Sequence, residues 1–132
     1  MNRSIAIILL GLLLTVGTVV AQKDYCFEND GLKVKQIINL TVTGTKVEGT
    51  MESGSDDPDT SMETFDFTGT KNGQVLSIKF EHKPPYELAP GTKRIVWTLR
   101  GTSLRVPTFG KNYNTQKWVP YTAVFDKCKE TK

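Results

Sequence analysis

Few residues in this chain have the types and spacing that catalytic chemistry requires. His82 is the only histidine, and it begins the proline-rich segment HKPPYELAPG. One histidine cannot form a zinc site once both cysteines are bridged, and the sequence suggests no Ser–His–Asp arrangement. We therefore expect His82 to be a surface-loop residue, and we expect no catalytic residue, no metal site and no cofactor.

The segment SGSDDPDTSMETFD, residues 53–66, gathers carboxylates that could be read as calcium ligands. An EF-hand loop requires a central glycine and a final bidentate glutamate at fixed spacing, and this segment has neither. We predict a solvated acidic loop between two strands. Paired carboxylates could also hydrolyse a glycosidic bond, so a glycan-active enzyme remains a remote alternative.

The segment FGKNYNTQKW, residues 109–118, combines three aromatic side chains with two lysines. Aromatic rings can stack on a sugar or an aliphatic group, and the cations beside them can hold an anion. The competing interpretation is a cross-strand aromatic pair that only stabilises a hairpin, by about 0.2–1 kcal/mol. The candidate binding residues are Arg105, Phe109, Lys111, Tyr113, Lys117 and Trp118.

A hairpin turning between Tyr113 and Asn114 would place Phe109 opposite Trp118 and Pro107 opposite Pro120. Tyr113 suits a two-residue turn poorly, so a four-residue loop in the same register is favoured. Both prolines would then lie at a non-hydrogen-bonded pair, and the sheet should open beside them. The inward face would collect Leu104, Val106, Thr108, Val119, Tyr121, Ala123 and Phe125.

Apolar residues alternate with polar ones along most of the chain, which is the period of strands. The expected strands cover residues 32–42, 47–51, 65–69, 76–80, 95–99, 104–109 and 117–125. Asn72-Gly73 is a strong hairpin signal, and a short helix fits only within 82–92 or near Asp30. We predict an all-β fold of seven or eight antiparallel strands, as an up-and-down meander barrel or, alternatively, a two-sheet sandwich.

The two cysteines, Cys26 and Cys128, lie near the two ends of the chain. A disulfide between them requires the first and last strands to be neighbours, which favours a closed barrel. In the chain-entropy model a bridge closing about 100 residues stabilises the fold by roughly 4–5 kcal/mol. Two free thiols or an intermolecular bridge are the alternatives.

The chain begins with Arg3 and an apolar run from Ile5 to Val20, followed by the small residue Ala21. This is the pattern of a secretory signal peptide covering residues 1–21, and an uncleaved anchor is the alternative. Residues 22–132 then form a single secreted or periplasmic domain without a transmembrane segment. The sequon at Asn39 faces outward and matters only in a eukaryotic secretory pathway.

Charge is distributed unevenly along the chain. Without Arg3 there remain 16 basic and 14 acidic residues, a balance that argues against a nucleic-acid partner. Residues 48–66 hold seven acidic residues and no basic one, whereas residues 88–125 hold six basic residues and no acidic one. If the two runs lie on opposite walls, a basic face could meet a polyanionic glycan, an acidic protein or anionic lipid headgroups; if they lie together, they neutralise each other.

Repeated Gly-Thr turns, at residues 44–45, 49–50, 69–70 and 101–102, accompany the strand pattern. In strand number and length the chain resembles the small exported meander barrels of the lipocalin and avidin type. The resemblance implies the barrel architecture but no binding residues, because Gly31 is not followed by the tryptophan of the lipocalin motif. We expect a non-catalytic binding protein, an interaction module or inhibitor that recognises a protein or glycan through the last hairpin. The alternative is a carrier of a small apolar ligand in the barrel lumen.

Overall fold

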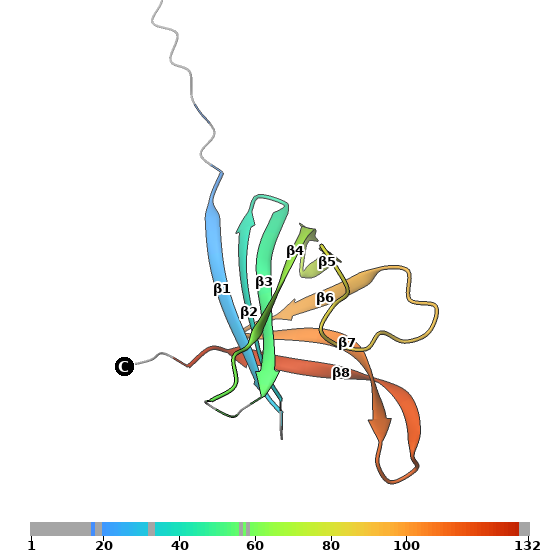
Figure 1. The fold of residues 1–132 in the computed structure, drawn as a ribbon. Helices are drawn as coiled ribbons and strands as arrows, with labels where there is room; N and C mark the ends of the chain where they lie inside the picture. The colour runs from blue at the N-terminus through green and yellow to red at the C-terminus, as the bar shows by residue number, and fades with distance from the viewer. Residues whose placement is uncertain (1–16, 18–19, 32–33, 56, 58, 130–132) are drawn as a thin grey trace, which may run out of the picture.

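The computed structural model describes residues 17, 20–31, 34–55, 57 and 59–129, and it is all β. Its strands follow one another along the chain (Figure 1). They are β1 (Gln22–Asp30), β2 (Val34–Thr43), β3 (Lys46–Ser55), β4 (Glu63–Asn72), β5 (Val75–Phe80), β6 (Ile95–Arg100), β7 (Ser103–Asn112) and β8 (Lys117–Lys127).

The strands close into one antiparallel barrel in the order β1 to β8, so each strand pairs with its neighbours in sequence. The predicted all-β class and meander barrel are confirmed, and the sandwich alternative is wrong. The short helix allowed within residues 82–92 is absent, because turns and bends occupy that segment. The strand expected from residue 32 is described from Val34, since residues 32 and 33 lie outside the described residues.

The two ends of the barrel differ in their connections. At one end, Gly44, Gly73 and Gly101 each take the first position of a two-residue turn with a positive φ, of 63°, 60° and 57°. Glycine adopts this conformation without steric strain, which explains why these turns can be so tight. At the other end the connections are longer, and they include the strap, which we define as residues 81–94 between β5 and β6.

The lumen of the barrel is filled by its own side chains. Trp97 is fully buried, and its ring meets Phe67 edge-on, with ring centroids 5.0 Å apart. Its Nε1 donates a hydrogen bond of 3.0 Å to the Tyr86 hydroxyl of the strap. The remaining core residues are Phe27, Ile38, Leu40, Val42, Val47, Met51, Leu76, Ile78, Phe80, Leu99, Leu104, Val106 and Phe125.

The seam between β1 and β8 is short. Only Phe27 and Glu28 of β1 pair with β8, opposite Lys127 and Asp126. The Cys26–Cys128 disulfide, with its Cα atoms 5.3 Å apart, lies at this seam, and the Cys128 amide donates to the Cys26 carbonyl at 3.0 Å. The predicted bridge between the terminal strands is therefore confirmed.

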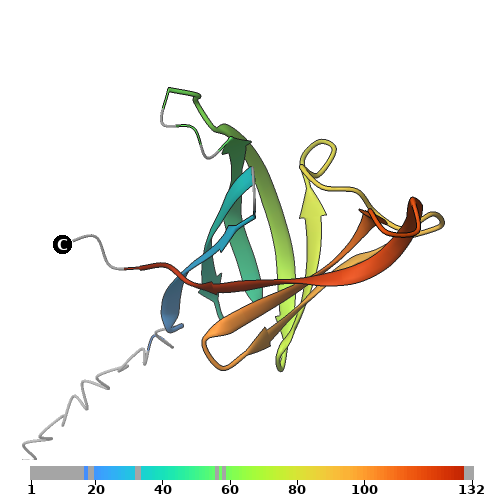
Figure 2. The same ribbon diagram turned by 90° about the horizontal axis from the view of Figure 1, so that it is seen from below.

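The last hairpin extends beyond this seam. β7 pairs with β6 only as far as Arg105, and β8 pairs with β1 only at Asp126 and Lys127, whereas β7 and β8 remain paired to Asn112 and Lys117. The hairpin therefore leaves the wall and projects as a two-stranded ribbon (Figures 1 and 2). We call the part from Val106 to Val124 the projecting hairpin.

The signal peptide predicted for residues 1–21 falls almost entirely on residues that the structure does not describe. Among the described residues, no helix has the length and apolar character needed to cross a membrane. Asn39 is exposed on β2, on the outward side that its position in the alternation predicts.

Candidate functional site

The projecting hairpin exposes apolar side chains that the rest of the barrel keeps inside. Every residue from 111 to 122 is exposed. Of the eight large hydrophobic side chains that are exposed in the described residues, five belong to this hairpin. They are Tyr113, Trp118, Val119, Tyr121 and Val124. Because exposed apolar surface that is gathered in one place marks interaction sites, the hairpin is the candidate functional site.

The outer face of the hairpin carries the aromatic pair that the sequence predicted, in a different register. The rings of Phe109 and Trp118 stack with centroids 5.8 Å apart and planes 28° apart. They are diagonal neighbours, because Phe109 lies opposite Pro120 and Trp118 lies opposite Lys111. The predicted pairings of Phe109 with Trp118 and of Pro107 with Pro120 are therefore wrong by two residues.

The tip explains the shift in register. Asn112 closes the hairpin opposite Lys117, so the loop has the expected four residues but lies one residue later in the chain, which moves each pairing partner on β8 by two residues. The Asn112 side chain accepts hydrogen bonds from the amides of Asn114 and Thr115, and Gln116 adopts a positive φ of 57°. A two-residue shift preserves the alternation, so the assignment of residues to the two faces survives.

The inward face is only partly core. Leu104, Val106 and Thr108 are buried as predicted, but Val119 and Tyr121 are exposed, which corrects the prediction. The reason is position: between Val124 and the tip β8 does not pair with β1, and Tyr121 borders an open hollow at the barrel mouth instead of packed side chains. Tyr121 instead packs across Gly110, where an added Cβ would lie only 2.3 Å from the tyrosine ring.

The predicted cations divide between the faces of the hairpin. Lys111 is on the outer face with Phe109 and Trp118, Arg105 is on the same face nearer the barrel, and Lys117 alternates to the inner face. Tyr113 stands at the tip, 83% exposed. Among the described residues, the ion pair that forms joins Lys46 and Glu48 on β3. No lysine or arginine of the hairpin forms an ion pair with a described residue.

The acidic and basic runs lie on opposite walls. In the order of the barrel, β3 and β4 are four positions from β7 and β8, so the acidic run faces away from the basic one. The strand order therefore separates β3 and β4 from the hairpin around the barrel, which favours the interpretation of a basic face.

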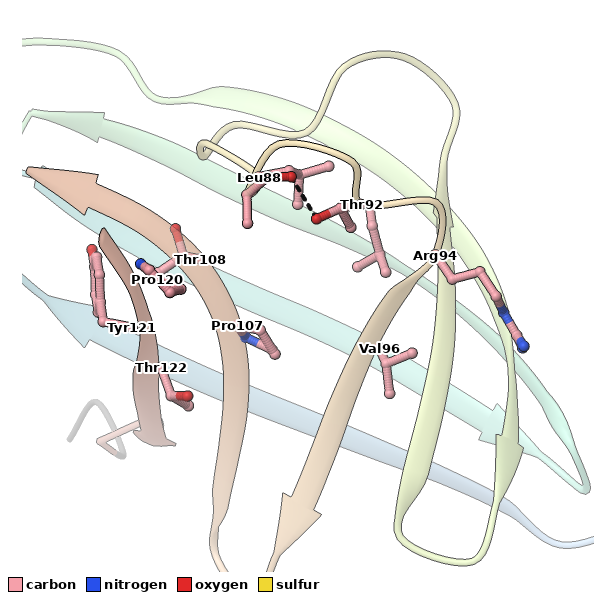
Figure 3. A pocket seen from close by; sticks show the side chains of 11 residues that line it. Leu88, Thr92, Arg94, Val96, Pro107, Thr108, Pro120, Tyr121 and Thr122 are labelled. Atoms are coloured by element: carbon pink, nitrogen blue, oxygen red, sulfur yellow. Dashed lines mark hydrogen bonds between the residues drawn. The ribbon is translucent and has the colours of Figure 1, made fainter. Parts of the chain in front are cut away.

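The strap holds the base of the projecting hairpin. The Glu87 carbonyl accepts hydrogen bonds from the Phe109 amide at 2.9 Å and from the Thr108 hydroxyl at 3.1 Å. These two hydrogen bonds take the place of the β6–β7 strand pairing, which ends at Arg105. Between the strap and the hairpin lies an open groove of about 290 Å³, lined by Leu88, Arg94, Pro107, Pro120 and Thr122 among others (Figure 3). We call it the outer groove.

A second hollow lies at the barrel mouth, below the inner face of the hairpin. It measures about 550 Å³ and reaches from Gln36 and Met51 to Tyr121 and Phe125. Tyr86 is one of its lining residues, and burial raises the pKa of the Tyr86 hydroxyl to about 12. The hydroxyl therefore stays protonated at neutral pH. We call this hollow the mouth cavity.

The sequence predicted a loop at residues 82–91, but it did not predict that Tyr86 contacts Trp97 or that Glu87 holds the base of the hairpin. Tyr86 lies in a proline-rich loop without periodicity, so no pattern indicated that it reaches the core tryptophan. His82 is exposed in the same loop, as expected. Among the described residues, no three His, Cys, Asp or Glu side chains come together as a metal-binding group would require.

In comparisons with known proteins, no protein-family model, no curated protein and no solved structure matches this chain. The closed eight-stranded meander is consistent with the general plan of lipocalin-like and avidin-like barrels. The functional interpretation therefore rests on the geometry of this molecule.

Proposed function

We propose that this chain is an exported, non-catalytic binding protein that recognises a macromolecule through the projecting hairpin. The observation that carries the proposal is the contrast in exposure between two tryptophans. Trp97 fills the barrel at 0% exposure, whereas Trp118 is 53% exposed on an element that leaves the barrel wall.

The composition of the hairpin supports recognition of a partner. Tryptophan, tyrosine and arginine dominate the binding energy of protein interfaces. The hairpin supplies Trp118, Tyr113 and Tyr121, and Arg105 lies just before it on β7, with no acidic residue between them. The strap hydrogen-bonds the hairpin at Thr108 and Phe109, which restrains it before binding. A restrained surface loses less conformational entropy when it binds.

Export is part of the same proposal. The N-terminal pattern predicts a signal peptide. The disulfide joins residues with a sequence separation of 102, and disulfides form and persist in oxidising compartments. A secreted or periplasmic location is thus favoured. A non-catalytic role agrees with the exposed aromatic and basic character of the hairpin, where binding groups are gathered.

Site-specific photo-crosslinking in the producing cells tests the proposal. Tyr113 is replaced by p-benzoylphenylalanine, which keeps an aromatic side chain at the tip. The matched control carries the same replacement at Val75, an exposed apolar residue at the tight-turn end of the barrel. We expect discrete adducts from position 113 and none from position 75. Equal adducts from both positions, or none from 113, would overturn the proposed function.

A small apolar ligand in the mouth cavity is the second candidate function. The cavity volume of about 550 Å³ falls within the range of small-molecule sites, although the deeper lumen is filled. Native mass spectrometry of the mature protein, purified gently from its host, distinguishes the two. An added mass of roughly a few hundred daltons that disappears on denaturation would favour the cavity, and a bare monomer would favour the hairpin.

A further inference from the structure

We infer that the projecting hairpin is inserted into an acidic groove of a protein partner, which it contacts through side chains on both of its faces rather than by adding a strand. The inference rests on the proposed function, and it specifies the chemistry of the partner and the mode of binding.

Both faces of the hairpin are open, not one. On the outer face Trp118 and Val124 are exposed and Phe109 is half-buried, while on the inner face Val119 and Tyr121 are exposed. The tip residue Tyr113 is the most exposed of these. A flat partner would cover one face and leave the other in water. A groove covers both faces and the tip, and so removes all of this apolar surface from water.

The edges of the hairpin are poorly suited to strand addition. On β7 the Phe109 amide points away from β8, since it donates to the Glu87 carbonyl, so Pro107, two residues away, occupies an edge-facing position. On β8 the Val124 carbonyl points to the free edge, since it accepts from Asn29, so Pro120 also faces that edge. Proline has no N–H to donate, and prolines at edge positions block pairing with another strand.

The charges of the hairpin favour an acidic partner. Its cations are Lys111 on the outer face and Lys117 on the inner face, Arg105 lies just before it on β7, and no acidic residue occurs between residues 88 and 125. In the strand order, β3 and β4, which carry the barrel's acidic run, are four positions away from β7 and β8. Complementary charge accelerates association and fixes the orientation of a complex.

A protein explains the hairpin better than an acidic glycan does. A sulfated glycan needs mainly cations along a surface, and although a sugar can stack on an aromatic ring, it gains little from the exposed valines. The hairpin offers five exposed large apolar residues, one at the tip and four on β8, beside one lysine on each strand. That mixture fits a protein groove with an apolar floor and an acidic rim.

The test measures binding of a fluorescently labelled copolymer of glutamate and tyrosine, an acidic polypeptide with aromatic side chains, to the mature protein at low and physiological salt. Dextran sulfate serves as the acidic glycan. Three variants are compared: Lys111→Glu, Trp118→Ser, and the control Lys79→Glu, which makes the same charge change at an exposed strand residue on β5.

We expect the copolymer to bind in a salt-dependent way. Lys111→Glu and Trp118→Ser should each weaken binding about threefold to tenfold, and Lys79→Glu by less than about twofold. Equal losses with Lys111→Glu and Lys79→Glu would overturn the inference, because net charge alone would then explain binding. The inference would also be overturned, in favour of a glycan partner, if dextran sulfate bound more tightly than the copolymer and Trp118→Ser left that binding unchanged.

Absence of copolymer binding at low salt would also overturn the inference. The proposed function has a separate readout, the adducts from position 113. If adducts form but the copolymer does not bind, the hairpin remains the recognition element and the inference of an acidic partner is refuted. If neither the adducts nor copolymer binding is observed, the proposed function is refuted as well.

Discussion

The wall from β1 to β5 and the projecting hairpin share one sequence pattern, but the inward residues are buried in the wall and partly exposed in the hairpin. Both alternate apolar and polar residues in long antiparallel ladders. In β2 the inward residues Ile38, Leu40 and Val42 are buried, whereas in β8 the inward Val119 and Tyr121 are exposed. The difference is what stands behind the strand: β2 faces a filled lumen, and the outer part of β8 has passed the rim. Alternation therefore assigns a residue to a face, but closure of the sheet decides whether that face becomes core.

The largest effect is expected from breaking the seam that closes the wall. Replacing both Cys26 and Cys128 by serine removes the bridge beside a ladder of only two residue pairs. In the chain-entropy model the free energy of unfolding should fall by roughly 4–5 kcal/mol, measured by urea denaturation. An unchanged midpoint would show that the short ladder and the core close the barrel by themselves.

The two tryptophans give the most direct comparison of the regions. Trp97→Ala should lower the free energy of unfolding by about 3–5 kcal/mol, because it empties the centre of the lumen. Phe109→Ala together with Trp118→Ala should lower it by only about 0.5–1.5 kcal/mol, the value of an aromatic pair. Denaturation followed by circular dichroism measures both. A comparable loss in the double variant would make the outer pair part of the core.

The strap contributes through Tyr86. Tyr86→Phe leaves the buried Trp97 Nε1 without its acceptor, which should cost about 1–3 kcal/mol at neutral pH.

This contribution depends on pH. The folded-state pKa of Tyr86, about 12, is raised above the ordinary value of 10.0, so the unfolded chain loses the proton first. The extra stability is complete below pH 10 and is lost as the pH rises towards 12, by about 1.4 kcal/mol for each pH unit. The difference in unfolding free energy between wild type and Tyr86→Phe should therefore shrink over this window. A constant difference would mean that the hydroxyl does not titrate as its burial implies.

The smallest effect on stability is expected at the edge of the hairpin. Pro120→Thr restores an N–H at an exposed edge and should change the free energy of unfolding by no more than about 0.5 kcal/mol. It should nevertheless promote self-association through strand pairing, seen as a concentration-dependent dimer in sedimentation velocity. The matched control is Thr122→Val, at another edge-facing position that already has an N–H. If Pro120→Thr associates no more than this control, Pro120 does not protect the edge.

The sequence predicted the parts of the fold that local patterns determine. Alternation located seven of the strands but not β1, Gly73 marked a tight turn, and the cysteines indicated which strands meet. The register of the last hairpin was wrong by two residues, because it depends on the hydrogen bonds that Asn112 makes within the tip. The exposure of Tyr121 depends on how far the hairpin extends past its neighbouring strands, and the contact of Tyr86 with Trp97 depends on the path of the strap; residue spacing encodes neither.

The central claim is that the outer aromatic pair serves a partner and not the fold. The most direct test is the yield of photo-crosslinked adducts from position 113 in the Phe109→Ala, Trp118→Ala double variant, compared with the same probe in the otherwise wild-type chain. We predict that the double variant stays folded and loses the adducts. A folded double variant that forms the adducts in full yield would contradict the claim, because the partner would then be recognised without the pair.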